Sequence, residues 1–129
     1  MNYYQRSVVE VTFNLPQGTE AHPAIIISCD NANIEESTIV CVMTTSDKTE
    51  DDFTFRLNPQ MFEGKFPLIS YQARLHLVSM FSAEKDVIVN RHHGIRMKSE
   101  HFDRIMERIF LVTFGYRLRI DSNLKQENV

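Results

Sequence analysis

The chain has 129 residues, of which 43% are hydrophobic and 24% are charged. This balance is that of a soluble globular domain and excludes disorder over most of the chain. The formal net charge of −3 argues against a protein that binds nucleic acid through charge alone, because contacts from Lys and Arg to phosphates supply much of that affinity. No apolar run is long enough to span a membrane, and the first residues lack the apolar core of a signal peptide, so we expect a cytoplasmic protein.

The charge is unevenly divided along the chain. Residues 1–64 hold three Lys and Arg against ten Asp and Glu, whereas residues 65–129 hold eleven against seven. The second half can therefore present a local basic surface. The alternative is that its helical arginines simply face solvent.

The first half of the chain predicts three strands. Residues 8–13 and 38–44 are rich in β-branched side chains, and residues 24–29 form a continuous apolar run typical of a strand buried on both faces. Residues 14–22 contain Pro and Gly and predict a loop, and residues 30–33, with Asp and Asn, predict a turn.

The second half starts with an acidic loop, Asp47 to Asp52, and continues with an alternating strand at residues 53–57. Residues 67–78 read as a long strand, and residues 86–90 as a short one. In the long strand, the period of two places four polar side chains on one face. They are Ser70, Gln72, Arg74 and His76.

One helix is expected, at residues 99–115. Ser99 is a good N-cap, the apolar residues follow 3.6-residue spacing, and Gly115 is a natural terminator. The strands and this closing helix predict a mainly β fold, a small barrel or highly curved sheet. We expect one domain at residues 1–116, followed by a polar tail at 117–129.

Cys29 and Cys41 both lie in apolar stretches and are expected to be small buried thiols. The sequence has no CxxC, HExxH or clustered Cys and His spacing. We therefore expect neither a metal site nor another cofactor.

Four segments, in order, resemble the MazF/PemK family of toxin ribonucleases. Residues 22–28 resemble a strand that begins with a basic residue and Pro and ends in Ser. Residues 38–46 resemble the strand that ends in a functional Thr, and residues 68–74 the strand that carries Gln with Arg two residues later. Residues 99–115 resemble the closing helix of the family.

The resemblance implies an SH3-like barrel of the MazF/PemK/CcdB type, with five to seven strands and a C-terminal helix, that forms homodimers. It also implies metal-independent cleavage of single-stranded RNA through a 2′,3′-cyclic phosphate. The implied protein partner is an antitoxin with an acidic disordered segment.

His22 stands where active members of the family generally carry Arg or Lys. Histidine titrates near neutral pH and can transfer protons more readily than Arg, but it gives up the forked contact to phosphate. The alternative interpretation is a histidine at a strand edge whose hydrogen bonds are satisfied by the backbone.

The resemblance implies further site residues. Thr44 and Thr45 are candidate catalytic hydroxyls, with Thr44 aligning best with the family Thr, and Gln72 and Arg74 are candidate RNA-binding residues. Without the resemblance, the threonines are interpreted as strand formers, and Gln72 and Arg74 as polar residues on the outer face of a strand.

Arg91, followed by two histidines, is a further candidate RNA-binding residue that the family motifs do not include. The alternatives are a loop at a dimer interface and a loop that is simply exposed.

Two other functions stay open. One is a catalytically inactive MazF/PemK-like barrel that binds a protein or nucleic acid, and the other is a toxin that poisons a protein target. Cleavage requires that His22, Thr44, Gln72 and Arg74 converge on one site.

Overall fold

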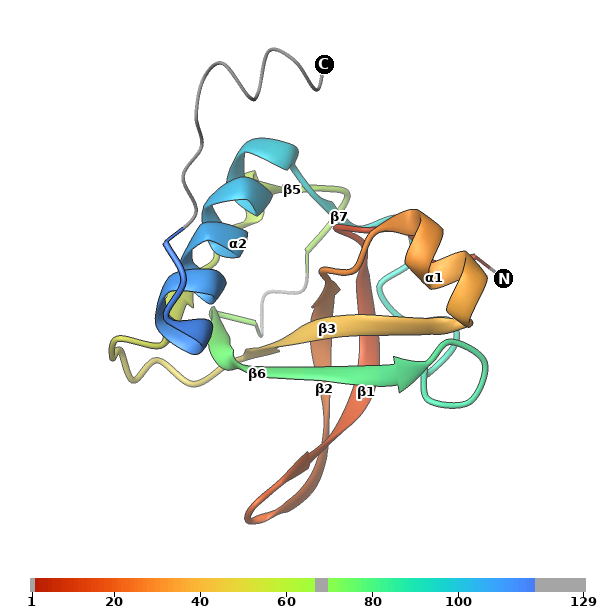
Figure 1. The fold of residues 1–129 in the computed structure, drawn as a ribbon, viewed down its shortest axis with the longest axis horizontal. Coiled ribbons are helices and arrows are strands. Elements are labelled where there is room, and N and C mark those ends of the chain that lie inside the picture. Colours follow the sequence, from red (N-terminus) through yellow and green to blue (C-terminus); the bar gives the residue numbers. More distant parts are fainter. Residues whose placement is uncertain (1, 67–69, 118–129) are drawn as a thin grey trace.

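A computed structural model describes residues 2–66 and 70–117 (Figure 1). The elements are seven strands, two α-helices and one short 3-10 turn. In chain order they are β1 (Val8–Leu15), β2 (Gly18–Ile26), α1 (Asp30–Glu36), β3 (Thr38–Thr45), β4 (Thr54–Arg56), η1 (Pro59–Met61), β5 (Phe62–Glu63), β6 (Gln72–Ser82), β7 (Arg96–Met97) and α2 (Ser99–Phe114).

The main sheet has the order β1-β2-β3-β6-β4, and each neighbouring pair is antiparallel. Strands β5 and β7 form a second, two-stranded sheet. The expected fold class, mainly β with a C-terminal helix, is confirmed. Within residues 2–66 and 70–117 no pairing joins β1 to β4, so the main sheet curves without closing into a complete barrel.

Each face of the sheet covers its own apolar core. One core lies under α2 and contains Ile25, Val42, Leu75 and Ile105, all fully buried. The second core lies on the opposite face and contains Val11, Ile26, Ile39 and Cys41. Neighbouring residues such as Ile25 and Ile26 belong to different cores because side chains alternate along a strand. The expected burial on both faces is confirmed for residues 24–26, whereas β2 ends at Ile26 and residues 27–29 are half-buried or exposed.

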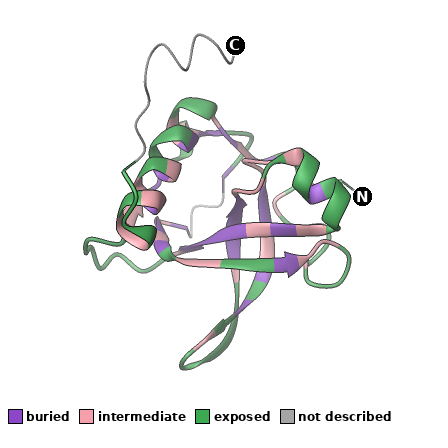
Figure 2. Ribbon diagram, in the orientation of Figure 1, coloured by how far each residue is buried: buried purple, intermediate pink, exposed green. Residues whose placement is uncertain are grey.

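The expectation of a loop at residues 14–22 is wrong. β1 continues to Leu15 and pairs with Gly18, so the two strands form a hairpin whose tip projects from the body (Figures 1 and 2). Most of the tip is exposed, and its strands therefore carry polar residues on both faces. Gly18, with φ of 136°, supplies the turn conformation that other residues rarely adopt.

Three other local expectations also differ from the structure. Residues 30–33 begin helix α1, and they do not form a simple turn. Residues 86–90 form no strand; Val87 makes a single bridge to Val11. Cys29 is exposed, because β2 ends before it, whereas Cys41 is buried as expected, and that burial raises the pKa of its thiol.

The long strand begins at Gln72, and the part of the expectation at residues 67–69 lies outside the described residues. The closing helix is confirmed as Ser99–Phe114, with Lys98 at the N-cap in place of Ser99, and with Gly115 in left-handed backbone at its end. No helix of the described residues is long and apolar enough to cross a membrane. Beyond residue 117, the expected polar tail also lies outside the described residues.

Candidate functional site

His22 lies in β2 directly opposite Val11 of β1, so its side chain is on the face of the second core. Its ring packs against Phe13 with the ring centroids 6.3 Å apart. The Nε2 atom lies 3.5 Å from Oε2 of Glu20. The Nε2 atom is buried and has no hydrogen-bond partner among the described residues.

Thr44 has its side chain on the other face of the sheet. It is fully buried, donates to the carbonyl of Pro23 at 2.7 Å and lies 3.2 Å from Oγ of Ser70. This hydroxyl is therefore committed to holding β2, β3 and the segment before β6 together. The sequence did not show this, because a strand residue can point to either face until the register is known.

Thr45, the next residue, has the opposite orientation. It pairs with Gln72 of β6, and its side chain is partly exposed. The pairing of β2 with β3 runs from Ala24 opposite Met43 to Ile26 opposite Cys41, so alternation along each strand puts the side chains of His22 and Thr45 on the same face. Thr45 and Gln72 are direct partners on this face, whereas the His22 side chain contacts Phe13 and Glu20.

Gln72 and Arg74 share this face, as their spacing of two predicts. The Gln72 side chain is 1% exposed, and its Nε2 donates to the carbonyl of Thr49 at 2.9 Å. Its Oε1 is buried without a hydrogen-bond partner in the part of the chain that the structure describes. Arg74 pairs with Met43 and donates to Oδ2 of Asp51 at 3.0 Å. We call His22, Thr45, Gln72 and Arg74 the polar row.

Arg56 is a site residue that the sequence analysis missed. It pairs with Gln72 across β4 and β6, and its guanidinium lies 4.8 Å from the centroid of the Tyr71 ring. It also forms an ion pair with Glu50. The alternation at residues 53–57 was the signal, because it places Arg56 on one face with Thr54.

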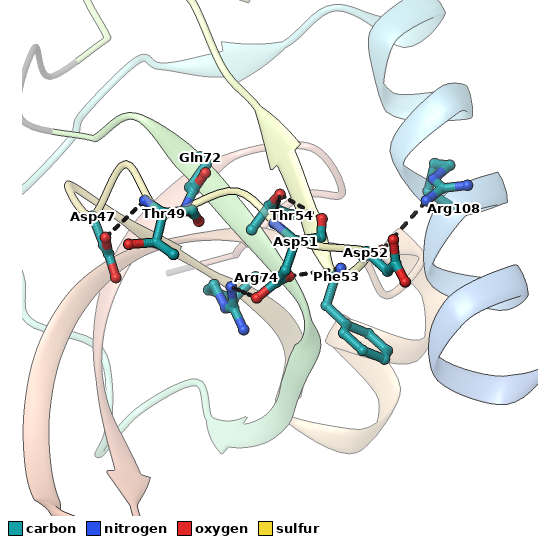
Figure 3. A network of polar contacts seen from close by, with 9 residues as sticks. All are labelled: Asp47, Thr49, Asp51, Asp52, Phe53, Thr54, Gln72, Arg74 and Arg108. Carbon is teal, nitrogen blue, oxygen red and sulfur yellow. Dashed lines mark hydrogen bonds and ion pairs between the residues drawn. The ribbon is translucent and has the colours of Figure 1, made fainter.

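The loop between β3 and β4, residues 46–53, covers part of the polar row (Figure 3). We call it the acidic loop. Hydrogen bonds to side-chain oxygens fix its shape: the amide of Thr49 donates to Asp47, and that of Phe53 to Asp51. The Phe53 amide, followed by Arg74, lowers the pKa of Asp51, and the amide of Thr49 lowers the pKa of Asp47.

Arg91 contacts none of these residues. Its guanidinium lies 3.8 Å from Glu10, which also contacts Nε2 of His92 at 2.8 Å. Glu10 faces Pro23, one position along from the pair of Val11 and His22. Glu10 therefore points to the face opposite His22, and the structure brings Arg91 to Glu10 and not to the polar row.

The described residues contain no cluster of side chains suited to bind a metal ion. Among the described residues no three His, Cys, Asp or Glu side chains lie close enough together to hold an ion. The groups at the polar row are an imidazole, a hydroxyl, an amide and a guanidinium. Together they can transfer a proton and donate hydrogen bonds to an anion.

The sequence profile of the PemK-like, MazF-like toxins of type II toxin–antitoxin systems matches residues 4–113. The chain belongs to this family. The resemblance that the sequence motifs indicate is thereby confirmed. Comparison with curated protein sequences gives no significant match.

Solved structures of MazF proteins share the fold. A MazF from Deinococcus radiodurans is 10% identical, with a TM-score of 0.68 over 90% of this chain and 99% of that one. An endoribonuclease in complex with its cognate antitoxin, from a mycobacterial species, is 14% identical, with a TM-score of 0.66 over 91% and 99%. A MazE–MazF complex from Deinococcus radiodurans is 11% identical, with a TM-score of 0.63 over 89% and 98%.

The MazF/PemK fold of this chain thus extends over nearly all of each of these proteins. At these identities the similarity is one of fold, and individual side chains must be judged from their own surroundings. By that criterion, four members of the expected set share one face: His22, Thr45, Gln72 and Arg74. The Thr44 side chain lies on the opposite face, where it holds β2 and β3 together.

Proposed function

We propose that this MazF/PemK-like protein is a metal-independent endoribonuclease that cleaves single-stranded RNA. The observation that carries the proposal is that His22, Thr45, Gln72 and Arg74 share one face of the main sheet. Family membership and the endoribonuclease among the structural neighbours support the same activity.

The reaction needs a proton acceptor for the 2′-hydroxyl, and we assign this role to His22, whose Nε2 forms no hydrogen bond within the described residues. The 2′ oxygen attacks the adjacent phosphorus, and the bond from phosphorus to the 5′ oxygen breaks. The leaving oxygen takes back the proton from the imidazolium. The products are a 2′,3′-cyclic phosphate and a free 5′-hydroxyl.

The other groups of the polar row stabilise and position the phosphate. The Thr45 hydroxyl donates to a non-bridging oxygen, and Arg74 offsets the negative charge that grows on the phosphorane. Gln72 uses its buried amide to bind a ribose or base edge of the same strand. Arg91, held by Glu10, takes no direct part in this scheme.

The proposed setting is the cytoplasm, with an antitoxin as partner. Two of the similar structures are complexes of an endoribonuclease or MazF with an antitoxin, and an acidic antitoxin segment suits Arg74 and Arg56. A homodimer is supported by an open apolar groove of about 310 Å³ between α2 and the sheet. Its lining includes Val40, Val78, Phe110 and Phe114.

The test is cleavage of single-stranded RNA by purified protein in EDTA, with end-group analysis of the fragments. Wild type is expected to release 2′,3′-cyclic phosphate ends. His22→Gln should reduce the rate by about a hundredfold or more, the contribution typical of general acid–base catalysis. The matched control is His93→Gln, since His93 is exposed and outside the row; it should cleave as wild type does.

The second candidate function is RNA binding without cleavage. It is favoured by one departure from the family pattern, the imidazole of His22 in place of a guanidinium or amine. Wild type that binds single-stranded RNA but gives no cyclic phosphate ends would establish this function and exclude the nuclease. If binding is absent as well, a protein target becomes the remaining class.

A further inference from the structure

The acidic loop, residues 46–53, contacts the polar row through the same atoms that an RNA strand would use. The Asp51 carboxylate accepts from Arg74 at 3.0 Å, as a phosphate oxygen would. Two residues earlier, the carbonyl of Thr49 accepts from Nε2 of Gln72 at 2.9 Å, as a base carbonyl would. Figure 3 shows both side chains directed toward the loop.

The loop also contacts two other arginines. Glu50 pairs with Arg56, and the carbonyl of Asp52 accepts from Arg108 of α2 at 3.4 Å (Figure 3). Three arginines, from β4, β6 and α2, thus each contact one of three consecutive loop residues, 50–52. A phosphate approaching the polar row would meet carboxylates first, and electrostatic repulsion would weaken its binding.

We infer that the acidic loop is an internal competitor for RNA, which occupies Gln72 and Arg74 in the free protein and must be displaced before a strand can bind. This inference rests on the proposed function, since it concerns regulation of the same site. If the loop carboxylates pair with Arg56 and Arg74 in the free protein, these arginines do not bind every polyanion that the protein meets.

The contacts are suited to release. The side chains of Arg74 and Asp51 are 27% and 44% exposed, and those of Arg56 and Glu50 are each 59% exposed. Ion pairs at such exposure contribute little net stability, so an RNA phosphate can replace them. The loop is anchored behind the site by the carbonyl of Phe53, which accepts from the amide of Leu75 at 2.8 Å, and this anchor need not break.

The test compares two double variants that remove the same number of charges. Glu50→Gln with Asp51→Asn removes the carboxylates that pair with Arg56 and Arg74. The control is Glu35→Gln with Glu36→Gln on helix α1, where both side chains are exposed. Binding is measured by fluorescence anisotropy with a single-stranded 2′-O-methyl RNA, which cannot be cleaved by this route.

The loop variant is expected to bind this RNA about three- to tenfold more tightly than wild type, since two exposed ion pairs no longer compete. The control should shift affinity by less than half of that on a logarithmic scale. Equal or weaker binding by the loop variant would overturn the inference, because the loop would then be neutral or would help to bind RNA.

Hydrogen exchange of wild type gives a second readout that needs no variant. Addition of the 2′-O-methyl RNA should speed exchange at the amides of Thr49 and Phe53, whose bonds to Asp47 and Asp51 hold the loop in shape. Slower exchange there would mean that the loop closes on RNA, which contradicts displacement.

Cleavage of an unmodified RNA separates the two ideas. If the loop variant binds more tightly but no cyclic phosphate forms, the loop competes with RNA and the proposed nuclease activity is wrong. Cleavage by wild type with unchanged binding in the loop variant supports the nuclease and removes the competitor. If neither protein binds or cleaves RNA, both ideas are wrong.

Discussion

The hydroxyl of Thr44 donates to the carbonyl of Pro23, the residue that follows His22, across a distance of 2.7 Å. This bond ties the end of β3 to the middle of β2 from the face opposite the His22 side chain. The catalytic candidate and the threonine expected to work beside it are thus coupled through the backbone. Thr45, one residue further, shares the face of His22.

Mutations of Thr44 and Thr45 should have different effects, one on stability and the other on RNA cleavage. Thr44→Val removes a buried donor and leaves the Pro23 carbonyl without it, so we expect a loss of about 2 kcal/mol in the free energy of unfolding. Thr45→Val should leave that free energy within about 0.5 kcal/mol and instead lower the rate of RNA cleavage. Urea denaturation and the cleavage assay measure the two effects; a stable Thr44→Val protein would show that its hydrogen bonds matter little.

The acidic loop should respond to pH through Asp51. The Phe53 amide and Arg74 favour the carboxylate, so the pKa of Asp51 in the folded protein lies below its ordinary value of 3.8. Its contribution to loop stability is therefore complete above that value and is lost as the pH falls through the lower folded pKa. The amide resonance of Phe53 should follow this titration, and in Asp51→Asn the titration step should disappear.

Gly64 directly follows β5 and lies close to the backbone of Gly94. It has a φ of +82°, and a Cβ there would lie 2.6 Å from the carbonyl oxygen of Gly94. We expect Gly64→Ala to cost about 3 kcal/mol, from backbone strain and the clash together. Gly115→Ala is the control, because Gly115 has a similar φ of +69° but open space around it, and about 1 kcal/mol should be lost.

The apolar groove beside α2 offers a test of the homodimer. Phe114 lines the groove and is 57% exposed, so a charge at this position should be tolerated by the monomer fold. Phe114→Glu should move the protein from dimer to monomer in sedimentation velocity at micromolar concentration, because the carboxylate would be desolvated in the interface. Wild type that sediments as a monomer would contradict the dimer itself.

Sequence reasoning predicted the family, the buried strands of β1, β2 and β3, and helix α2. These features depend on local patterns: β-branched runs, Ile25 and Ile26 without a polar neighbour, and apolar spacing that ends at Gly115. The same reasoning missed the hairpin at residues 14–22, since its strands extend beyond the core and lack an apolar face. Helix α1 was missed because Asn and Asp favour turns when considered alone.

The sequence by itself determined which residue types this protein has for RNA chemistry and in which order they follow one another. Only the tertiary structure decided which of them meet. A shift of one residue in strand register turns a side chain to the other face, so the pairing of Thr45 with Gln72, and not the motif, decides which of the two threonines shares the face of His22. The contact of Asp51 with Arg74 joins residues 23 positions apart, and no local pattern could reveal it.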